Sequence, residues 1–257
     1  MKNLWTLTQR ELGALFLSPI AYLVLIAMVI LSTWNFIDVL EQLERLRAES
    51  AGEMSPMVQY IAYNLSFWFA ILVITSLVTM RLLAEEKRSG TIEVLMTAPV
   101  TDTEVVLSKY LACVLFYATL WVPSILFLVV LRKVGGYEFD LRPLYAIYLG
   151  VLTIGGMFMA MGLFFSSCTR NQIVAAILTF VVNAMIFFTF VMHYWLEQNT
   201  GSRWNAWAPV VKYIAVLLQM YDLGTGKMDL KYLAYHLSVI VFMLFLTVKI
   251  VEVRKWR

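Results

Sequence analysis

Residues 144–165 read LYAIYLGVLTIGGMFMAMGLFF, an apolar run without a charged side chain. A helix needs about 20 such residues to cross the hydrocarbon core of a bilayer. A helix that is apolar on every side is buried, either in the core of a large protein or in a membrane. The run therefore predicts a membrane-spanning helix, and similar runs occur on both sides of it.

Five further runs have comparable length and composition. Closed β-barrels also satisfy every backbone polar group in lipid, but these runs lack the strict alternation of barrel strands. We therefore expect an all-α integral membrane protein that forms a single transmembrane domain over residues 1–257. The six predicted transmembrane spans cover residues 18–37, 60–80, 105–131, 144–165, 172–195 and 232–248.

The composition of the chain agrees with a lipid environment. Apolar residues make up 61% of the 257 residues and charged residues 14%, whereas soluble domains average about 45–50% and about 25%. The net charge is only +3 and no basic run of the type that binds nucleic acid occurs, so nucleic acid is not an expected partner. Cys113 and Cys168 match no metal or redox spacing and are expected to be small packing residues.

The charges beside the spans predict an orientation. An even number of spans places both termini on one side of the membrane. The basic tail from Arg254 to Arg257 follows the last span directly, while the loop after the first span is acidic. Cytoplasmic loops carry the excess of Lys and Arg, so we expect both termini in the cytoplasm. The first run lacks a cleavage site, and a cleaved signal peptide is not expected.

Residues 1–17 are expected to form an interfacial helix. At helical spacing Trp5, Leu12 and Phe16 share one narrow sector, and Glu11 points away from it. Such a helix lies in the membrane surface with its polar side towards water.

A second short helix is expected before the last span. The stretch from Val210 to Met220 is apolar but too short to cross a bilayer. Trp204, Trp207 and Tyr221 flank it as aromatic anchors. These features predict a re-entrant or surface-lying helix.

Residues 85–104, between the second and third spans, form more than a minimal connection. After a charged cluster the chain breaks at Gly90, and a short helix-compatible piece follows until Pro99, which disfavours helical geometry in the residue before it. Thr101 and Glu104 then form a capping box that starts the third span. The pattern leaves two interpretations: a helix that docks in a groove of a partner, or a surface turn that only joins two spans.

Residues 85–101 read EEKRSGTIEVLMTAPVT, with two glutamates, basic residues, Gly-Thr, an acidic residue, a Leu-containing piece and a proline in this order. This order resembles the coupling region of ABC-2-type transporter permeases. Residues 162–177 and 226–232 are also similar to that family, so the resemblance extends along the chain. Within the family, the chain is most similar to permeases associated with bacterial gliding motility.

The resemblance implies a transmembrane permease subunit without its own ATPase. The sequence agrees, because it contains no Gly-x-x-x-x-Gly-Lys-Ser/Thr phosphate loop. No catalytic, cofactor-binding or metal-binding residue is expected, and ATP with Mg²⁺ would bind to the partner ATPase. In the family, this segment transmits the movement of two ATPase subunits. The residues to which that coupling role carries over are Glu85, Glu86, Gly90, Thr91, Glu93, Leu95 and Pro99.

Three of these residues have an expected role. Gly90 would free the backbone for a turn, Glu93 would meet the basic edge of a groove in the ATPase, and Leu95 would fill an apolar pocket. The resemblance also implies a permease that pairs as a homodimer or with a related permease and binds two ATPase subunits. The expected location is the bacterial inner (cytoplasmic) membrane.

Other polar residues are expected to serve packing. His193 and His236 lie near span ends without a further ligand at metal spacing. The middle of each span lacks carboxylates and lysines, which argues against a proton-coupled transporter and against a membrane hydrolase. Hydrogen bonds between helices are expected from Asn64, Thr75, Ser76, Thr179, Asn183 and Thr189. Close packing of the fourth span, and part of a permease–permease interface, are expected from Gly150, Gly155, Gly156, Ala160 and Gly162.

The leading hypothesis is the transmembrane subunit of an ATP-driven ABC-2-type exporter. The alternative is a non-transporting membrane component of an envelope or gliding-motility assembly that uses the same ATPase coupling. A membrane-embedded enzyme is a third hypothesis. The sequence does not identify a substrate.

Overall fold

The regular elements in the computed structural model are all helical, which confirms the expected all-α fold for the part of the chain that it describes. This part comprises residues 2–49, 64–91, 100–133, 142–198, 206–225 and 229–254. Its helices are α1 (Lys2–Phe16), α2 (Pro19–Glu49), α4 (Leu65–Thr79), α5 (Ala84–Ser89), α7 (Asp102–Leu120), α8 (Val122–Lys133), α9 (Arg142–Cys168), α10 (Gln172–Phe187), α11 (Thr189–Gln198), α12 (Ala208–Ile214), α13 (Val216–Gly224) and α14 (Leu230–Arg254).

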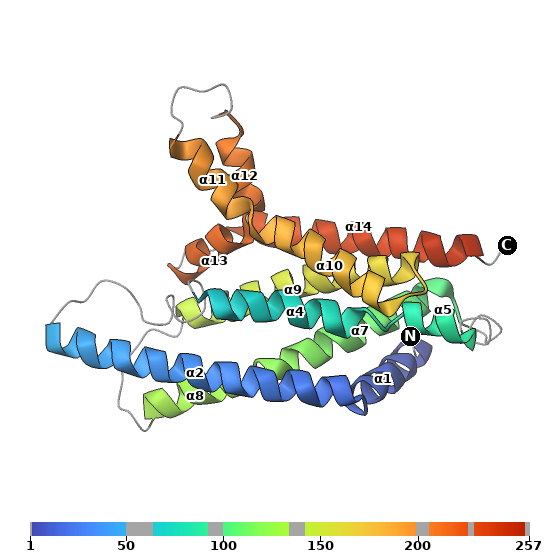
Figure 1. Ribbon diagram of the computed structural model, residues 1–257, viewed down its shortest axis with the longest axis horizontal. Coiled ribbons are helices and arrows are strands. Elements are labelled where there is room, and N and C mark those ends of the chain that lie inside the picture. The colour runs from blue at the N-terminus through green and yellow to red at the C-terminus, as the bar shows by residue number, and fades with distance from the viewer. Residues whose placement is uncertain are drawn as a thin grey trace.

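Within the described residues, six helical stretches are long and apolar enough to cross a membrane, as the sequence predicts. The longest helices lie side by side along the long axis of the molecule (Figure 1). The start of α1, the end of α14 and the short helix α5 lie towards the same end of this bundle (Figure 1). The six stretches are Pro19–Glu41, Leu65–Ser89, Asp102–Lys133, Leu144–Cys168, Gln172–Gln198 and Leu230–Val253.

The core of the bundle lies around α9, which contacts α4, α7, α10, α13 and α14. Most of α9 and α4 is buried, whereas α2, α10 and α14 expose apolar side chains along their length. Exposure of apolar surface to water costs roughly 25 cal/mol per Å². Lipid tails impose no such cost, so the exposed apolar surface agrees with a membrane environment.

Small residues let α9 approach its neighbours closely. A Cβ atom on Gly150 would lie 2.7 Å from Leu223 Cδ1, and one on Gly162 would lie 2.7 Å from Thr79 Cβ. The expected close packing is confirmed. The expected contribution of these residues to a permease–permease interface is wrong. They face helices of the same chain, and side chains of those helices occupy the space beside them.

Hydrogen bonding inside the bundle is mostly local. Asn183 Nδ2 of α10 donates to Thr75 Oγ1 of α4 at 3.4 Å, and both side chains are fully buried. This pair confirms the expected bonding between helices. The other four residues make local bonds instead. Asn64 caps the start of α4, and carbonyls three or four residues earlier accept from Ser76, Thr179 and Thr189.

Helix α1 packs on α7, but not with the orientation that its own apolar pattern predicts. Leu12 and Phe16 pack against the core, and the Phe16 ring lies 5.1 Å from that of Phe116. Trp5, however, is 58% exposed, and Glu11 faces inward. The prediction that Glu11 points away from this side is therefore wrong, because an ion pair with α7, described below, turns it inward.

Two of the predicted spans are interrupted. The third breaks at Trp121 between α7 and α8, where Pro123 supplies no N–H for a continuous helix. The fifth breaks at Phe188, after which α11 leaves the bundle and pairs with α12 in a projecting hairpin (Figure 1).

The apolar stretch before the last span forms two helices instead of one. Ala215 is extended, with φ −71° and ψ 93°, and separates α12 from α13. The break leaves the carbonyl of Tyr213 available, and Gln219 Nε2 donates to it at 2.5 Å. Gln219 Oε1 in turn lies 2.8 Å from His236 Nε2 of α14. Gln219, inside the stretch, thus bonds the carbonyl at the break and also contacts α14.

Candidate coupling site

The chain turns at residues 80–83 between α4 and α5, and Ser166 of α9 holds this turn. Ser166 Oγ accepts hydrogen bonds from the N–H groups of Leu83 and Ala84, each at 3.1 Å, and donates to Met80 O at 3.2 Å. The first N–H groups of a helix have no partner inside the helix. A side chain of α9 supplies the partner here, which fixes the start of α5 to the core.

The end of α5 is also defined. Lys87 is buried and its ammonium group donates to the carbonyl of Ser167 on α9. Gly90 then adopts φ 76°, a left-handed conformation that glycine takes at little cost, and ends the helix. Thr91 follows, with Oγ1 2.8 Å from Ser89 Oγ. The chain thus leaves a firmly attached α5 through a sharp turn.

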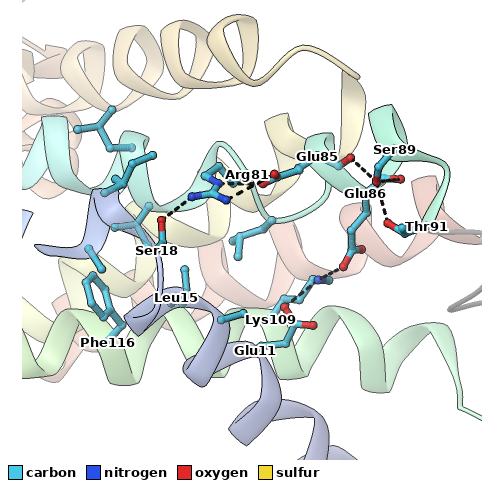
Figure 2. Close-up of a pocket in the computed structure, with 16 residues that line it drawn as sticks. Glu11, Leu15, Ser18, Arg81, Glu85, Glu86, Ser89, Thr91, Lys109 and Phe116 are labelled. Atoms are coloured by element: carbon cyan, nitrogen blue, oxygen red, sulfur yellow. Dashed lines mark hydrogen bonds and ion pairs between the residues drawn. The ribbon is translucent and has the colours of Figure 1, made fainter. Parts of the chain in front are cut away.

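A buried lysine joins three helices beside α5. Lys109 of α7 is only 2% exposed, and its Nζ lies 2.5 Å from Glu86 Oε1 of α5 and 2.9 Å from Glu11 Oε2 of α1. Figure 2 shows both carboxylates pointing towards this ammonium group. Glu86 Oε2 is buried and has no hydrogen-bond partner among the described residues, so its charge is stabilised chiefly by Lys109. We call Glu11, Glu86 and Lys109 the ion triad.

Arg81, in the turn before α5, makes a second link. Its Nε lies 2.8 Å from Glu85 Oε2, and its Nη1 donates to Ser18 Oγ at 2.5 Å. Ser18 stands between α1 and α2. Glu85 therefore pairs with Arg81, and its neighbour Glu86 pairs with Lys109. Each of these two cations also contacts a residue in the N-terminal part of the chain (Figure 2).

These links surround a cavity of about 320 Å³ among α1, α2, α4, α5 and α7. Apolar side chains such as Leu15, Leu77 and Phe116 line one part of it, and the charged residues line the other. The carboxylates of Glu85 and Glu86 are both paired with cations. The arrangement is suited to holding helices together, since neither carboxylate is available to act as a base.

Four of the seven predicted coupling residues lie in the described part of the chain. Glu85, Glu86, Gly90 and Thr91 gather at α5, as given above. The other three lie outside the described residues: Glu93, Leu95 and Pro99.

The capping box at the end of the segment is confirmed. Thr101 Oγ1 accepts from the Glu104 N–H at 3.3 Å, and Glu104 Oε2 accepts from the Thr101 N–H at 3.0 Å. Both contacts involve exposed groups at the start of α7. The local pattern therefore identified this helix start correctly.

Sequence reasoning missed Lys109, Arg81, Glu11 and Ser166. Lys109 carried a usable signal, since it is a lysine inside the predicted span 105–131 and a charge in a membrane helix is expected to face a partner. The contacts that the other three make between helices had no such signal, because the residues that they join lie 63 to 98 positions apart in the sequence. Arg81 also has a local partner, Glu85, four positions further on.

The two histidines lie inside the protein. His193 is buried in the α11–α12 hairpin, with Nδ1 3.2 Å from Ala208 O and Nε2 3.2 Å from Glu197 Oε1. The expectation that no carboxylate stands at a suitable spacing was therefore wrong for His193. His236 lies between α9 and α13, bonded to Thr153 as well as to Gln219. Neither belongs to a group of three or more potential metal ligands within the described residues.

Comparison with known proteins identifies the chain at the family level. The family described as "ABC-2 family transporter protein" matches residues 41–250, which cover most of the chain. The match spans α4, α5 and every helix up to most of α14. A comparison with curated proteins found no matching sequence.

Proposed function

Because the chain belongs to the ABC-2 transporter family, a family of membrane permease components, we propose that it is the transmembrane subunit of an ATP-driven exporter. A separate ATP-binding protein supplies the energy in this proposal. Two copies of this ATPase bind a permease dimer, which consists either of two copies of this chain or of one copy and a related permease. The permease lies in the bacterial inner membrane, with its termini and α5 on the cytoplasmic side.

The observation that carries this proposal is the attachment of α5. Ser166 holds its start, Lys87 bonds to α9, and Glu86 joins it to α7 and α1. A surface turn that only joined two spans would need none of these buried contacts. A segment that receives force from a partner needs a firm attachment to the spans, and the contacts around α5 support that role.

The docking surface itself is proposed for the residues that follow Gly90. Glu93 and Leu95 would enter a groove of the ATPase, with the acidic side chain at its basic edge and the leucine in an apolar pocket. Gly90 redirects the chain immediately before them. The Thr101 capping box then starts α7.

Co-purification with the ATP-binding partner tests this proposal. Glu93→Arg and Leu95→Arg are each expected to abolish co-purification, because they place a cation at a basic edge or in an apolar pocket. Leu230→Arg is the matched control, since Leu230 is exposed at the start of α14 and the change should leave co-purification intact. Survival of the complex in both docking variants would contradict the docking surface.

A role in a gliding-motility or other envelope assembly is the alternative, supported by the resemblance within the family. In that case the same ATPase coupling would move or anchor an assembly without transporting a cargo. Stimulation of ATP hydrolysis by candidate lipids, polysaccharide precursors or peptides would favour the exporter, and its absence for all of them would favour the alternative.

A further inference from the structure

The ion triad holds α1 and α5 on α7 through a single ammonium group. Lys109 is almost completely buried, and an ammonium group removed from water is stable only where charged partners replace its hydration. The two partners come from different helices, Glu11 from α1 and Glu86 from α5. Neither helix can move away from α7 alone without leaving a buried charge short of a partner. The triad therefore favours a joint movement of the three helices.

Arg81 adds a second point of attachment. Its guanidinium group contacts Glu85 through two nitrogens, at 2.8 and 3.4 Å, and Ser18 through a third. Glu11 lies within α1, whereas Ser18 follows its end, so the two links hold separate points of the N-terminal part of the chain. Two separated links prevent a rotation that one link would allow, so the position of α1 relative to α5 is fixed in angle as well as in distance.

We infer that Lys109 and Arg81 join α1 and α5 into one rigid body, which transmits nucleotide-driven movement of α5 to α1 and α7. The inference rests on the proposed function, since the ATPase would supply the movement. Lys109 and Arg81 are positioning residues, because they act through the carboxylates that they hold. The glutamate pair Glu85-Glu86 is accordingly a pair of internal attachments.

The test requires a reporter on α1. Trp5 is exposed on α1, so Trp5→Cys in a Cys168→Ser background carries a fluorescent or spin label. The labelled full-length permease is placed in lipid nanodiscs with its partner ATPase, and a non-hydrolysable ATP analogue is added. In the parent protein the label signal is expected to change when the nucleotide binds.

Removal of the ion-triad contacts should strongly reduce this response while the ATPase stays bound. Lys109→Met and the milder Glu11→Gln are expected to reduce the nucleotide-dependent signal change by about tenfold, a typical size for a coupling between two sites. Lys249→Met is the matched control, because Lys249 is an exposed lysine whose contacts, with Glu252 and the Phe245 ring, lie within its own helix. It should leave the response unchanged. A purely structural role for the triad would not produce a bound but silent complex.

A charge inversion provides the rescue. Glu11→Lys, Glu86→Lys and Lys109→Glu together keep three alternating charges at the same positions, and are expected to restore at least part of the response lost in Lys109→Met. A full response in both Lys109→Met and Glu11→Gln, with the ATPase bound, would overturn the inference. If Lys109→Met does not fold, Glu11→Gln decides by itself, since it leaves the Glu86–Lys109 pair in place.

The two proposals fail in different ways. If the parent permease binds the ATPase but the label on α1 does not respond to nucleotide, the inference about the rigid body is wrong and the proposed function stands. If the parent permease binds no ATPase, the proposed function fails and the inference fails with it.

Discussion

Gly162 illustrates how single residues set the packing of this protein. It lies where α9 meets α4 and α10, and an added Cβ atom would be 2.7 Å from Thr79 Cβ and 3.0 Å from Thr179 Cγ2. Carbon atoms in contact are normally about 3.5–4.0 Å apart. Both threonines are fully buried, so they have no free space into which to move. A hydrogen atom is therefore the only side chain that this crossing admits.

We predict that Gly162→Ala lowers the free energy of unfolding by about 1–3 kcal/mol, the usual cost of overpacking a core. Gly13→Ala in α1 is the control, because nothing lies within 4 Å of its added Cβ atom. That change should stabilise the protein by about 0.5–1 kcal/mol through its helix preference. Thermal unfolding of the two variants in detergent measures the difference. An unchanged melting temperature for Gly162→Ala would contradict the close crossing.

At the scale of elements, the attachment of α5 depends on a side chain from another helix. Two N–H groups at the start of α5 and a carbonyl at the end of α4 all bond to the Ser166 hydroxyl. Ser167, the next residue, is equally buried, but its hydroxyl donates to Phe164 O in its own helix. The hydroxyl groups of these adjacent serines thus have different consequences: that of Ser166 joins two elements, and that of Ser167 bonds only within α9.

We predict that Ser166→Ala destabilises the protein by about 1–3 kcal/mol, because it leaves buried N–H groups without partners. Hydrogen exchange at the Leu83 and Ala84 amides should accelerate in this variant, since both lose their acceptor. Ser167→Ala should cost less than about 1 kcal/mol, because the carbonyl that it frees remains in a helix ladder. Equal exchange in the two variants would show that Ser166 does not hold the turn.

At the scale of the whole molecule, the chain is a bundle whose buried centre is α9 and whose outer helices present apolar side chains. The two cysteines fall on opposite sides of this division. Cys113 is buried in α7, as expected for a packing residue, whereas Cys168 is exposed at the end of α9. The expectation of a packing role was therefore wrong for Cys168. Cys168 lies at the end of the bundle where α5 is, so its accessibility reports which side of the membrane that end faces.

We predict that a membrane-impermeant maleimide labels Cys168 in inside-out vesicles and not in right-side-out vesicles, because the α5 end faces the cytoplasm in the proposed orientation. Cys113 should stay unlabelled until the protein is denatured. Cys168→Ser is the control and should remove all labelling of the folded protein. Labelling restricted to right-side-out vesicles would reverse the proposed orientation.

Much of the fold was accessible from the sequence because lipid narrows the choices. Backbone polar groups in a bilayer must bond within their own segment or within a closed barrel, so six long apolar runs specify six helices. The Thr101–Glu104 capping box was also predictable, since its partners are three residues apart. Glu85, Glu86, Gly90 and Thr91 came from the resemblance of one short segment to a family, and the structure places them together at α5.

Only the tertiary structure decided what these elements do to one another. The local pattern of α1 placed Glu11 outside, but Lys109 on a distant helix turns it inward. The small residues of α9 suggested a surface for a second permease, and the chain fills that surface with its own helices. Length and apolarity thus determined a membrane protein with six membrane-spanning stretches, because the bilayer acts on each run separately. Buried charge pairs and helix crossings join residues far apart in the chain, and no local period of a sequence records such pairs.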